Sequence, residues 1–455
     1  MKLTIIGGAG ARVPLLVTGL LRIRDELPIE CLALWDIDTD RQVLIRKVCE
    51  AMIERSGVQM KIQVGGAVEE AVEDADFVIS SVRVGGTASR IQDEKIALSH
   101  GVLGQETVGP GGWAMALRTI PTVLEYARTV DKVAPRAWFL NFTNPVGIVQ
   151  QALLSAGMTR VIGVCDTPRE LFEAVANELG VRSCNAFFDY LGLNHLGWLR
   201  SVLVDGRDQL RDLLSDNNRL KRLYPVPLFD PDYLRRLGLL PTEYVYFYLR
   251  PKHAIEQLSR ARQTRGQMVA EQEAELFNIL ASDGCEPAKL LFAYNTFLAK
   301  RNATYLQLET GGEVGGKRVE EARQELYEKA AGYERIAIDV IRAIARNRPA
   351  VFPVDVANNG SVDELETGDA VEVPCLIDGN GARPLAVGAM PEAVRELFLH
   401  TKVYERITVR AALEKSATLA AEALFSNPFV GSSQLAQQLT DEYRSAHRPY
   451  LDYLN

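Results

Sequence analysis

The chain has 455 residues, of which 47% are hydrophobic and 24% charged. These values are typical of globular proteins with two or three domains and exclude a disordered chain. The net charge of −8 argues against nucleic acid as a partner, because sequence-independent binding needs a positive surface. No apolar run reaches the ~18–20 residues of a membrane span. The N-terminus lacks the apolar stretch of a secretory leader, and the six cysteines form no CxxC pair, so we expect a cytoplasmic protein with reduced thiols and no membrane partner.

The first ~200 residues alternate short apolar runs with amphipathic stretches, which is typical of parallel strands joined by helices. This alternation predicts an α/β fold that begins with a Rossmann-type, doubly wound parallel sheet. The expected strands are 3–6, 31–35, 76–82, 138–143 and 160–165, and the expected helices are 14–27, 39–55, 68–74 and 113–134.

Beyond residue 196 the pattern changes to longer helices, with the clearest at 318–347 and 391–425 and a charged helical region around 254–281. Two strand-like segments, 351–358 and 370–377, lie between them. We therefore expect a second domain of mixed α/β, helix-rich structure. The expected division is into domains 1–195 and 196–455.

A glycine cluster directly follows the first expected strand, and a helix begins near Pro14. Glycines at this place allow a tight turn and a close approach to a pyrophosphate, which the helix N-terminus stabilises. Asp36 ends the second strand, where a carboxylate binds a ribose hydroxyl and favours NAD over NADP. Val13 replaces the third glycine of the GxGxxG pattern, and ordinary turns also use glycine; the pairing with Asp36 favours dinucleotide binding. The candidate residues are Gly7, Gly8, Gly10, Ala11, Arg12 and Asp36.

Six further segments combine polar and glycine residues, and several of them follow expected strands, where open α/β sheets bind ligands. Among them, Cys165 and His195 offer a thiolate and an imidazole, which suit a divalent transition metal. Two protein ligands would leave positions open for substrate oxygens. Spacing alone favours two buried residues with satisfied partners over a metal pair. The segments are 82–86, 104–112, 141–145, 163–168, 193–198 and 240–244.

Together these segments resemble glycoside hydrolase family 4, the NAD- and metal-dependent glycosidases that include 6-phospho-β-glucosidases, 6-phospho-α-glucosidases and α-galactosidases. The resemblance spans nearly the whole chain, through GQETVGPGG, NFTNP, CDTP and NHLGW to the stretch 356–374. It implies oxidation of the sugar at C3 by NAD, removal of the C2 proton, elimination of the glycosidic oxygen and addition of water. The family is an exception to the two-carboxylate mechanism of glycosidases.

The resemblance also implies roles for individual residues. Cys165 and His195 would hold the metal, most often Mn²⁺, which acts as a Lewis acid. Tyr244 would be the catalytic base, since a nearby cation can lower the pKa of a tyrosine; Tyr246 and Tyr248 are the alternatives, and an aromatic wall is the simplest explanation of the run.

Asp166 matches the general acid of the phospho-α-glucosidase branch, whereas the β branch has asparagine there. The segments GQETVGPGG and TNPVGIVQQAL favour the β branch. Because Asp166 and these segments point to different branches, the anomeric preference stays open. Arg83 is assigned to the cofactor, and Arg265 matches an arginine on the phosphate side of the substrate. Without the resemblance, each arginine would be interpreted as a member of a surface ion pair. The expected substrate-binding residues are Arg90, Glu106, Asn144, Asn194 and Arg265.

The sequence therefore predicts a 6-phospho-glycosidase, with the β type favoured, that uses NAD and manganese on a phosphorylated sugar. Domain 1–195 would bind NAD, and domain 196–455 would complete the catalytic site and mediate oligomerisation. The resemblance implies a homodimer or homotetramer. Two rivals remain: an NAD-dependent dehydrogenase of the lactate/malate type, and a sensor that kept the pocket and lost turnover.

Overall fold

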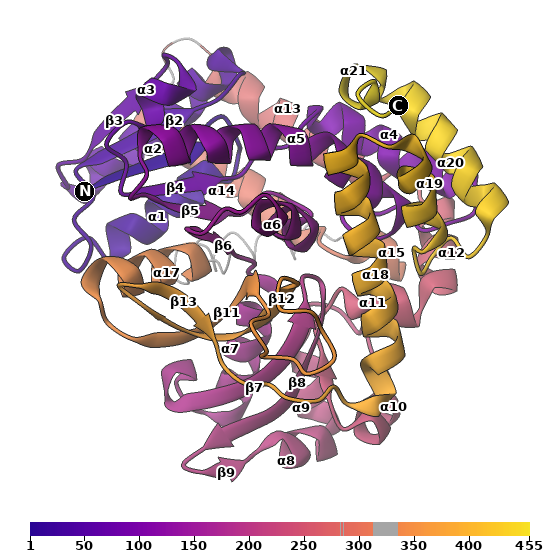
Figure 1. Cartoon of the computed structure of the whole chain (residues 1–455). Coiled ribbons are helices and arrows are strands. Elements are labelled where there is room, and N and C mark those ends of the chain that lie inside the picture. The colour runs from indigo at the N-terminus through magenta and orange to yellow at the C-terminus, as the bar shows by residue number, and fades with distance from the viewer. Residues whose placement is uncertain (283, 285, 313–334) are drawn as a thin grey trace.

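The computed structural model describes residues 1–282, 284, 286–312 and 335–455. One sheet runs through the described part of the molecule, and helices cover both of its faces (Figure 1). Six strands at one end are parallel and follow the order β3-β2-β1-β4-β5-β6, which is the order of a dinucleotide-binding Rossmann sheet. They are β1 (Lys2–Ile6), β2 (Cys31–Trp35), β3 (Lys61–Val64), β4 (Phe77–Ser80), β5 (Trp138–Asn141) and β6 (Val161–Gly163).

The helices of this half lie between the strands in sequence. The predicted strands and helices are confirmed to within a few residues, except that α1 ends five residues early. The sequence did not predict β3, a half-buried strand at the sheet edge, or α4, α6 and α7. The periodicity of α4 is hidden because Arg90, Asp93 and Glu94 are buried polar residues. The helices are α1 (Val13–Arg22), α2 (Thr39–Ser56), α3 (Val68–Val72), α4 (Gly86–Ser99), α5 (Gly109–Val133), α6 (Val146–Ser155) and α7 (Thr167–Leu179).

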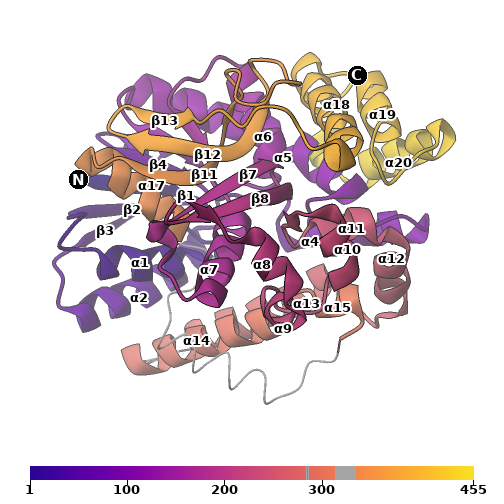
Figure 2. The same ribbon diagram turned by 90° about the horizontal axis from the view of Figure 1, so that it is seen from below.

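The remaining strands continue the same sheet in antiparallel fashion (Figure 2). The hairpin of β11 and β12 lies between the parallel strands and the β7–β8 hairpin, and it confirms both strand-like segments of the C-terminal half. Asp355 of β11 pairs with Gly163, and Glu372 of β12 pairs with Gly192. These strands are β7 (Ala186–Leu193), β8 (Leu196–Val204), β9 (Arg207–Asp208), β10 (Leu240–Pro241), β11 (Ala350–Ala357), β12 (Ala370–Asp378) and β13 (Gly381–Pro384).

One of the two long helices expected in the C-terminal half is divided in two, and the other is helical where the structure describes it. The segment 391–425 forms α18 (Glu392–Glu414) and α19 (Ala417–Phe425), because Lys415 adopts a left-handed φ of 57° and Ser416 caps the second helix. The described part of the expected helix 318–347 is α17 (Arg335–Arg346), and residues 318–334 lie outside the described residues. The other helices are α8 (Leu210–Ser215), α9 (Asn217–Arg222), α10 (Pro231–Leu237), α11 (Val245–Leu249), α12 (Pro251–Arg260), α13 (Arg265–Leu280), α14 (Pro287–Ala303), α15 (Gln307–Thr310), α20 (Ser433–Ala446) and α21 (Arg448–Leu451).

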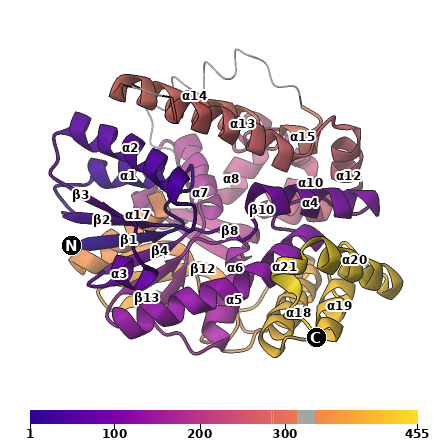
Figure 3. The ribbon, with the colours of Figure 1, turned by 90° about the horizontal axis from the view of Figure 1, so that it is seen from above.

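Helices from the second half pack on those of the first half on both sides of the sheet (Figure 3). On one side α13 contacts α4 and α14 contacts α2; on the other α18 contacts α5 and α6. Among the helices of the described residues, none has the length and apolar character needed to cross a membrane. The cysteines that the structure describes are free thiols.

A buried ionic cluster attaches the C-terminal helices to the first half. The carboxylate of Asp93 on α4 accepts two hydrogen bonds from Arg118 on α5, at 2.9 and 2.6 Å, and lies 2.7 Å from Nε2 of His447. Tyr443 of α20 donates to the backbone oxygen of Asp93 at 2.9 Å. Because the Asp93 and Arg118 side chains are each 1% exposed, water cannot replace a lost partner.

We predict that Asp93→Ala destabilises the full chain by about 3–5 kcal/mol, since it leaves the Arg118 guanidinium buried without its carboxylate. Thermal unfolding at a fixed scan rate measures the effect. As a control, Glu50→Ala removes the exposed Arg46–Glu50 pair and is expected to change stability by less than about 1 kcal/mol. Equal effects of the two substitutions would show that the buried cluster is not needed for the docking of the C-terminal helices.

Candidate active site

A cavity of about 470 Å³ lies among the segments that follow β1, β5 and β6. The carboxyl ends of parallel strands are where open α/β sheets bind ligands, and this volume suits a small molecule. Nine of the predicted site residues line the cavity, although they come from widely separated parts of the chain. They are Arg12, Arg90, Glu106, Asn144, Cys165, Asp166, His195, Tyr244 and Arg265.

The glycine loop lies against the ends of β2 and β4, outside the lining of the cavity. The N–H groups of Gly7 and Gly8 both donate to the carbonyl of Trp35, at 2.9 and 2.8 Å. A Cβ on Gly7, whose φ is +98°, would lie 2.2 Å from the Ser81 oxygen, so a side chain cannot be accommodated there. The Asp36 carboxylate accepts a hydrogen bond from Ala9 N–H at 2.9 Å. No side chain caps the first turn of α1, so this loop fits a dinucleotide phosphate at the helix N-terminus.

His195 occupies the turn between β7 and β8 with a positive φ of 65°. Its Nδ1 lies 3.0 Å from the hydroxyl of Thr107, and that hydroxyl donates to Oε1 of Gln105 at 3.0 Å. The same Gln105 oxygen accepts two backbone N–H groups, which fixes the orientation of the amide. Because the single hydroxyl proton of Thr107 is used on Gln105, Thr107 accepts from Nδ1–H, and the lone pair of His195 is on Nε2.

Burial lowers the pKa of His195 to about 4, so the ring is neutral at physiological pH, as metal ligation requires. Cys165 lines the same cavity, and burial, followed by the charges of Glu372 and Asp166, raises the pKa of its thiol well above the usual range. Among the described residues, no cluster of three or more His, Cys, Asp or Glu side chains has the arrangement of a metal site. Cys165 Sγ and His195 Nε2 are two donors at one cavity, and two protein ligands would leave positions on a cation open for substrate and water.

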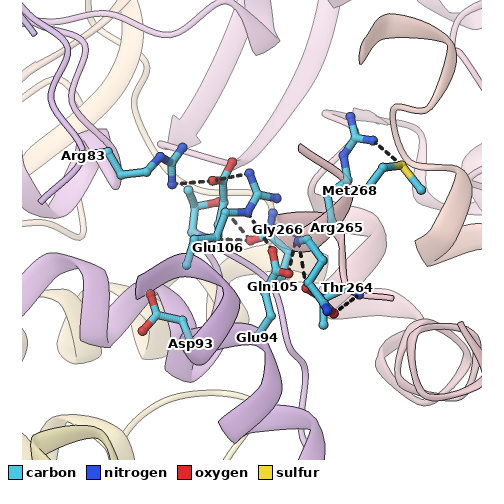
Figure 4. Close-up of polar contacts among 12 residues, drawn as sticks. Arg83, Asp93, Glu94, Gln105, Glu106, Thr264, Arg265, Gly266 and Met268 are labelled. Carbon is cyan, nitrogen blue, oxygen red and sulfur yellow. Dashed lines mark hydrogen bonds and ion pairs between the residues drawn. The ribbon is translucent and has the colours of Figure 1, made fainter. Parts of the chain in front are cut away.

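A chain of alternating charges includes Arg90 and Glu106 of the cavity lining (Figure 4). Oε2 of Glu106 lies 2.8 Å from Arg83 Nη1 and 2.7 Å from Arg90 Nη1. Arg90 also donates to Glu94 at 2.7 Å, and Glu94 accepts the N–H of Gly266, at the start of α13, at 2.7 Å. Burial alone would raise the pKa of Glu106, but the charges of Arg83 and Arg90 hold this pKa well below its usual value. The chain connects Arg83, expected at the cofactor, with the helix that carries Arg265.

The guanidinium of Arg265 is fixed by neutral acceptors, namely the Thr304 hydroxyl at 2.5 Å and the Arg301 carbonyl at 3.1 Å. Arg301 also lines the cavity with Arg12, Arg90 and Arg265. Burial, followed by the charges of Arg12 and Arg265, lowers the pKa of Arg301 to about 9. No sequence motif marks Arg301, which lies near the end of α14. Several guanidinium groups around one cavity are suited to a phosphate group.

Tyr244 precedes α11, and its ring stacks on the His195 imidazole with centroids 3.9 Å apart and an angle of 9°. Of the three tyrosines that the sequence left open, only Tyr244 lines the cavity. The Tyr246 hydroxyl lies 2.7 Å from His253 and donates to the Glu309 carbonyl. Glu243 and Tyr305 also line the cavity; Glu243 lies in the predicted segment 240–244 but had no assigned role, and nothing in the sequence indicated Tyr305.

Asn194 does not line the cavity. Its amide donates to Glu372 at 3.3 Å, and Glu372 also accepts the hydroxyl of Tyr190 at 2.7 Å. Burial is the main cause that raises the pKa of Glu372 from 4.5 to about 7, and burial with the charge of Glu372 raises that of Asp355 well above its usual value. These two carboxyl groups lie where the antiparallel hairpin meets its neighbouring strands.

Comparison with known proteins agrees with this geometry. Residues 2–181 match the model of the family 4 glycosyl hydrolases, and residues 190–430 match the model of their C-terminal domain. The chain is thus a glycosyl hydrolase with a Rossmann-type sheet. More specifically, it belongs to family 4 of these enzymes, as its resemblance in sequence predicts.

Relatives and solved structures extend over the whole chain. A 6-phospho-β-glucosidase of Escherichia coli (strain K12) is 31% identical over 99% of this chain and 96% of its own length. A 6-phospho-α-glucosidase of Lacticaseibacillus paracasei is 30% identical over 98% of this chain and 97% of its own length. The structure of a 6-phospho-β-glucosidase from Thermotoga maritima, which contains manganese, NAD⁺ and glucose 6-phosphate, is 28% identical with a TM-score of 0.82, and 99% of each chain is covered.

We predict that Glu372→Gln reduces the loss of stability that the ligand-free protein shows as pH rises from about 5 to 8. A carboxyl group whose pKa is raised by folding contributes its stability fully below pH 4.5 and loses it as pH rises through about 7. Glutamine mimics the protonated carboxyl and carries no charge to bury. Thermal unfolding of wild type and variant at several pH values should differ by on the order of 1–3 kcal/mol at pH 8. Glu414→Gln, at an exposed carboxyl, is the control; an unchanged pH dependence in Glu372→Gln would contradict the prediction.

Proposed function

We propose that this glycosyl hydrolase cleaves 6-phospho-glycosides, with 6-phospho-β-glucosides favoured, and that it uses NAD and a divalent cation, preferably Mn²⁺. The observation that carries the proposal is that one cavity brings together Cys165, His195 and Tyr244 with several buried arginines. The names of the relatives and the NAD⁺, manganese and glucose 6-phosphate in the Thermotoga structure support it.

A 6-phospho-α-glucosidase is the second candidate. Asp166 lines the cavity, where its carboxyl group would be a proton donor for a leaving oxygen, and relatives named for the α activity are nearly as similar as those named for the β activity. The arginines around the cavity argue against an enzyme of the α-galactosidase type whose substrate carries no phosphate. Because the chain belongs to family 4 of the glycosyl hydrolases, we do not propose a dehydrogenase of the lactate/malate type.

Under this proposal, one set of residues binds the cofactor and another binds the cation. Gly7, Gly8, Gly10, Ala11, Arg12, Asp36 and Arg83 would hold NAD, and Cys165 Sγ with His195 Nε2 would hold the cation. Bound there, the two groups supply hydride acceptance at C3 and polarisation of the sugar oxygens, which acidify the C2 proton.

The chain's own side chains perform the remaining steps. The hydroxyl oxygen of Tyr244 removes the C2 proton, and Asp166 protonates the departing oxygen. Arg265 and Arg301 bind the phosphate, while Glu106 keeps Arg90 in place beside the sugar. Asn144 contacts the sugar hydroxyls, and Asn194 keeps the turn that carries His195 in position through Glu372.

The proposal extends to organisation and location. We propose a cofactor domain over 1–195 and a second domain over 196–455, with the boundary in the β7–β8 turn, and a homodimer or homotetramer in the cytoplasm. The free thiols of the described cysteines support a reducing compartment.

Turnover of a 6-phospho-β-glucoside in D₂O is expected to place deuterium at C2 of the released glucose 6-phosphate, because a proton held by Tyr244 exchanges with solvent. No NADH should accumulate, since the cofactor is restored in each cycle. Proton NMR of the product and absorbance at the NADH band measure the two results. Hydrolysis with full retention of protium at C2 would disprove the proposal, as would stoichiometric NADH release.

Manganese binding should depend on both the ligands and the residue that orients one of them. Cys165→Ser replaces a soft ligand by a poor one, and Thr107→Val removes the acceptor that fixes Nδ1–H of His195, which is expected to weaken binding by about 10–100-fold. Electron paramagnetic resonance of free Mn²⁺ in a titration measures the affinity without turnover. Cys184→Ser, at an exposed thiol, is the control. Wild-type affinity in both variants would show that the cation binds elsewhere.

A further inference from the structure

The side chain of Tyr190 on β7 lies over the end of the β7–β8 hairpin that carries His195. Gly192 and Gly197 are paired across this hairpin, next to the last residue pair before the turn. A Cβ on Gly192 would lie 2.6 Å from the Tyr190 hydroxyl oxygen, and a Cβ on Gly197 would lie closer still. The tyrosine thus fills the space of two missing side chains beside the turn, and it requires glycine at both positions.

The hydroxyl of Tyr190 joins the hairpin to the neighbouring strand. It donates to Oε2 of Glu372 on β12 at 2.7 Å, and the amide of Asn194 donates to Oε1 of the same carboxyl group at 3.3 Å. Burial, followed by the charge of Glu372, raises the pKa of Tyr190 well above its usual value, so the hydroxyl keeps the one proton that it donates. Because Asn194 directly precedes His195, one carboxyl group holds both the tyrosine and the turn.

The ring of Tyr190 also packs on α7, which begins two residues after Cys165. Phe172 of α7 meets the Tyr190 ring edge to face, with centroids 5.6 Å apart, and stacks on Phe188 of β7 with centroids 4.4 Å apart. Tyr190 is 0% and Glu372 1% exposed, so bulk water cannot replace either partner. Tyr190 therefore contacts both the helix that follows Cys165 and the hairpin that carries His195.

Packing alone does not account for the hydroxyl. Phenylalanine would fill the same space against Phe172 and would need no buried acceptor. The hydroxyl instead ends on the carboxyl group that holds Asn194. If this donor is removed, the carboxyl group can turn about its side-chain bonds, and the Asn194 amide can move with it. Metal affinity is sensitive to partners of this kind, which orient a ligand without touching the metal.

We propose that Tyr190 is a positioning residue for the cation ligand His195: its hydroxyl fixes the Glu372 carboxyl group, which holds Asn194 and with it the turn. This inference rests on the proposed function, in which Cys165 and His195 bind the cation. Thr107 fixes the rotation of the imidazole ring, whereas Tyr190 fixes the backbone that carries the ring. Tyr190 keeps its proton throughout, and no bond to it forms or breaks.

The test compares Tyr190→Phe with Tyr443→Phe in the full chain. Each variant loses a buried hydroxyl with one hydrogen bond, so thermal unfolding should show similar losses of stability. Mn²⁺ affinity is measured by electron paramagnetic resonance, and NAD affinity by quenching of protein fluorescence. Tyr190→Phe is expected to weaken Mn²⁺ binding by about 10-fold, as for loss of a residue that orients a metal ligand, and to change NAD affinity less than about twofold. Tyr443→Phe is expected to leave both affinities unchanged.

Substitutions of Glu372 separate the hydrogen bonds from the charge. Glutamine offers an oxygen to Asn194 and an amide N–H to the Tyr190 oxygen, whereas leucine offers neither. Both variants remove the charge, so the difference between them reports the hydrogen bonds alone. Glu372→Gln is expected to bind Mn²⁺ at least about fivefold more tightly than Glu372→Leu.

The outcomes distinguish this inference from the proposed function. Wild-type Mn²⁺ affinity in Tyr190→Phe would overturn the positioning role, and so would equal losses in Tyr190→Phe and Tyr443→Phe or equal affinities in the two Glu372 variants. If Cys165→Ser also binds Mn²⁺ like wild type, the cation site of the proposed function fails as well. A loss in Cys165→Ser with none in Tyr190→Phe refutes the positioning role alone.

Discussion

The arrangement of the site depends on how the antiparallel hairpin of β11 and β12 joins its two neighbouring strands. Gly163 pairs with Asp355 on one side of the hairpin, and Gly192 pairs with Glu372 on the other. A Cβ on Gly163 would lie 2.6 Å from the Asp355 Cβ, so the close approach of β6 and β11 requires glycine. Cys165 follows Gly163 by two residues, and His195 follows Gly192 by three. The width of one hairpin thus sets the spacing between the two candidate metal ligands.

The same junction carries an electrostatic penalty. Asp355 and Glu372 are both about 1% exposed, and two carboxyl groups this close cannot both ionise without a large loss of stability. At the cavity, burial, followed by the charges of Arg12, Arg265 and Arg90, lowers the pKa of Arg301. A ligand of opposite charge reduces the repulsion between like charges in the site. A ligand that binds the native state but not the unfolded state also raises the stability of the protein. The ligand-free protein is therefore expected to be less stable than the loaded one.

The sequence predicted the parts of the molecule that depend on local pattern. The strands of the parallel half are short apolar runs, and the glycine loop and Asp36 follow two of them directly, so their positions could be inferred without a structure. The sequence did not predict α4, because its buried face includes Arg90, Asp93 and Glu94, and the partners of Asp93 and Glu94 include the distant Arg118 and Gly266. No role was predicted for Arg301 and Tyr305, because no motif marks them, nor for Glu243, although it lies in the segment 240–244.

The distribution of charge in the cavity gives the substrate a direction. Glu106 is shared by Arg83 and Arg90, whereas the guanidinium of Arg265 is held by the Thr304 hydroxyl and the Arg301 carbonyl. A phosphate is attracted to the guanidinium of Arg265. Burial is the main cause that raises the pKa of Glu243 to about 7, and the charge of Asp166 adds to it; both carboxyl groups line the cavity with Tyr244. Under the proposed function, a 6-phospho-glycoside whose phosphate contacts Arg265 and Arg301 would present its sugar ring to Tyr244 and Asp166, which line the same cavity. A substrate without phosphate would lose the contacts with the two arginines.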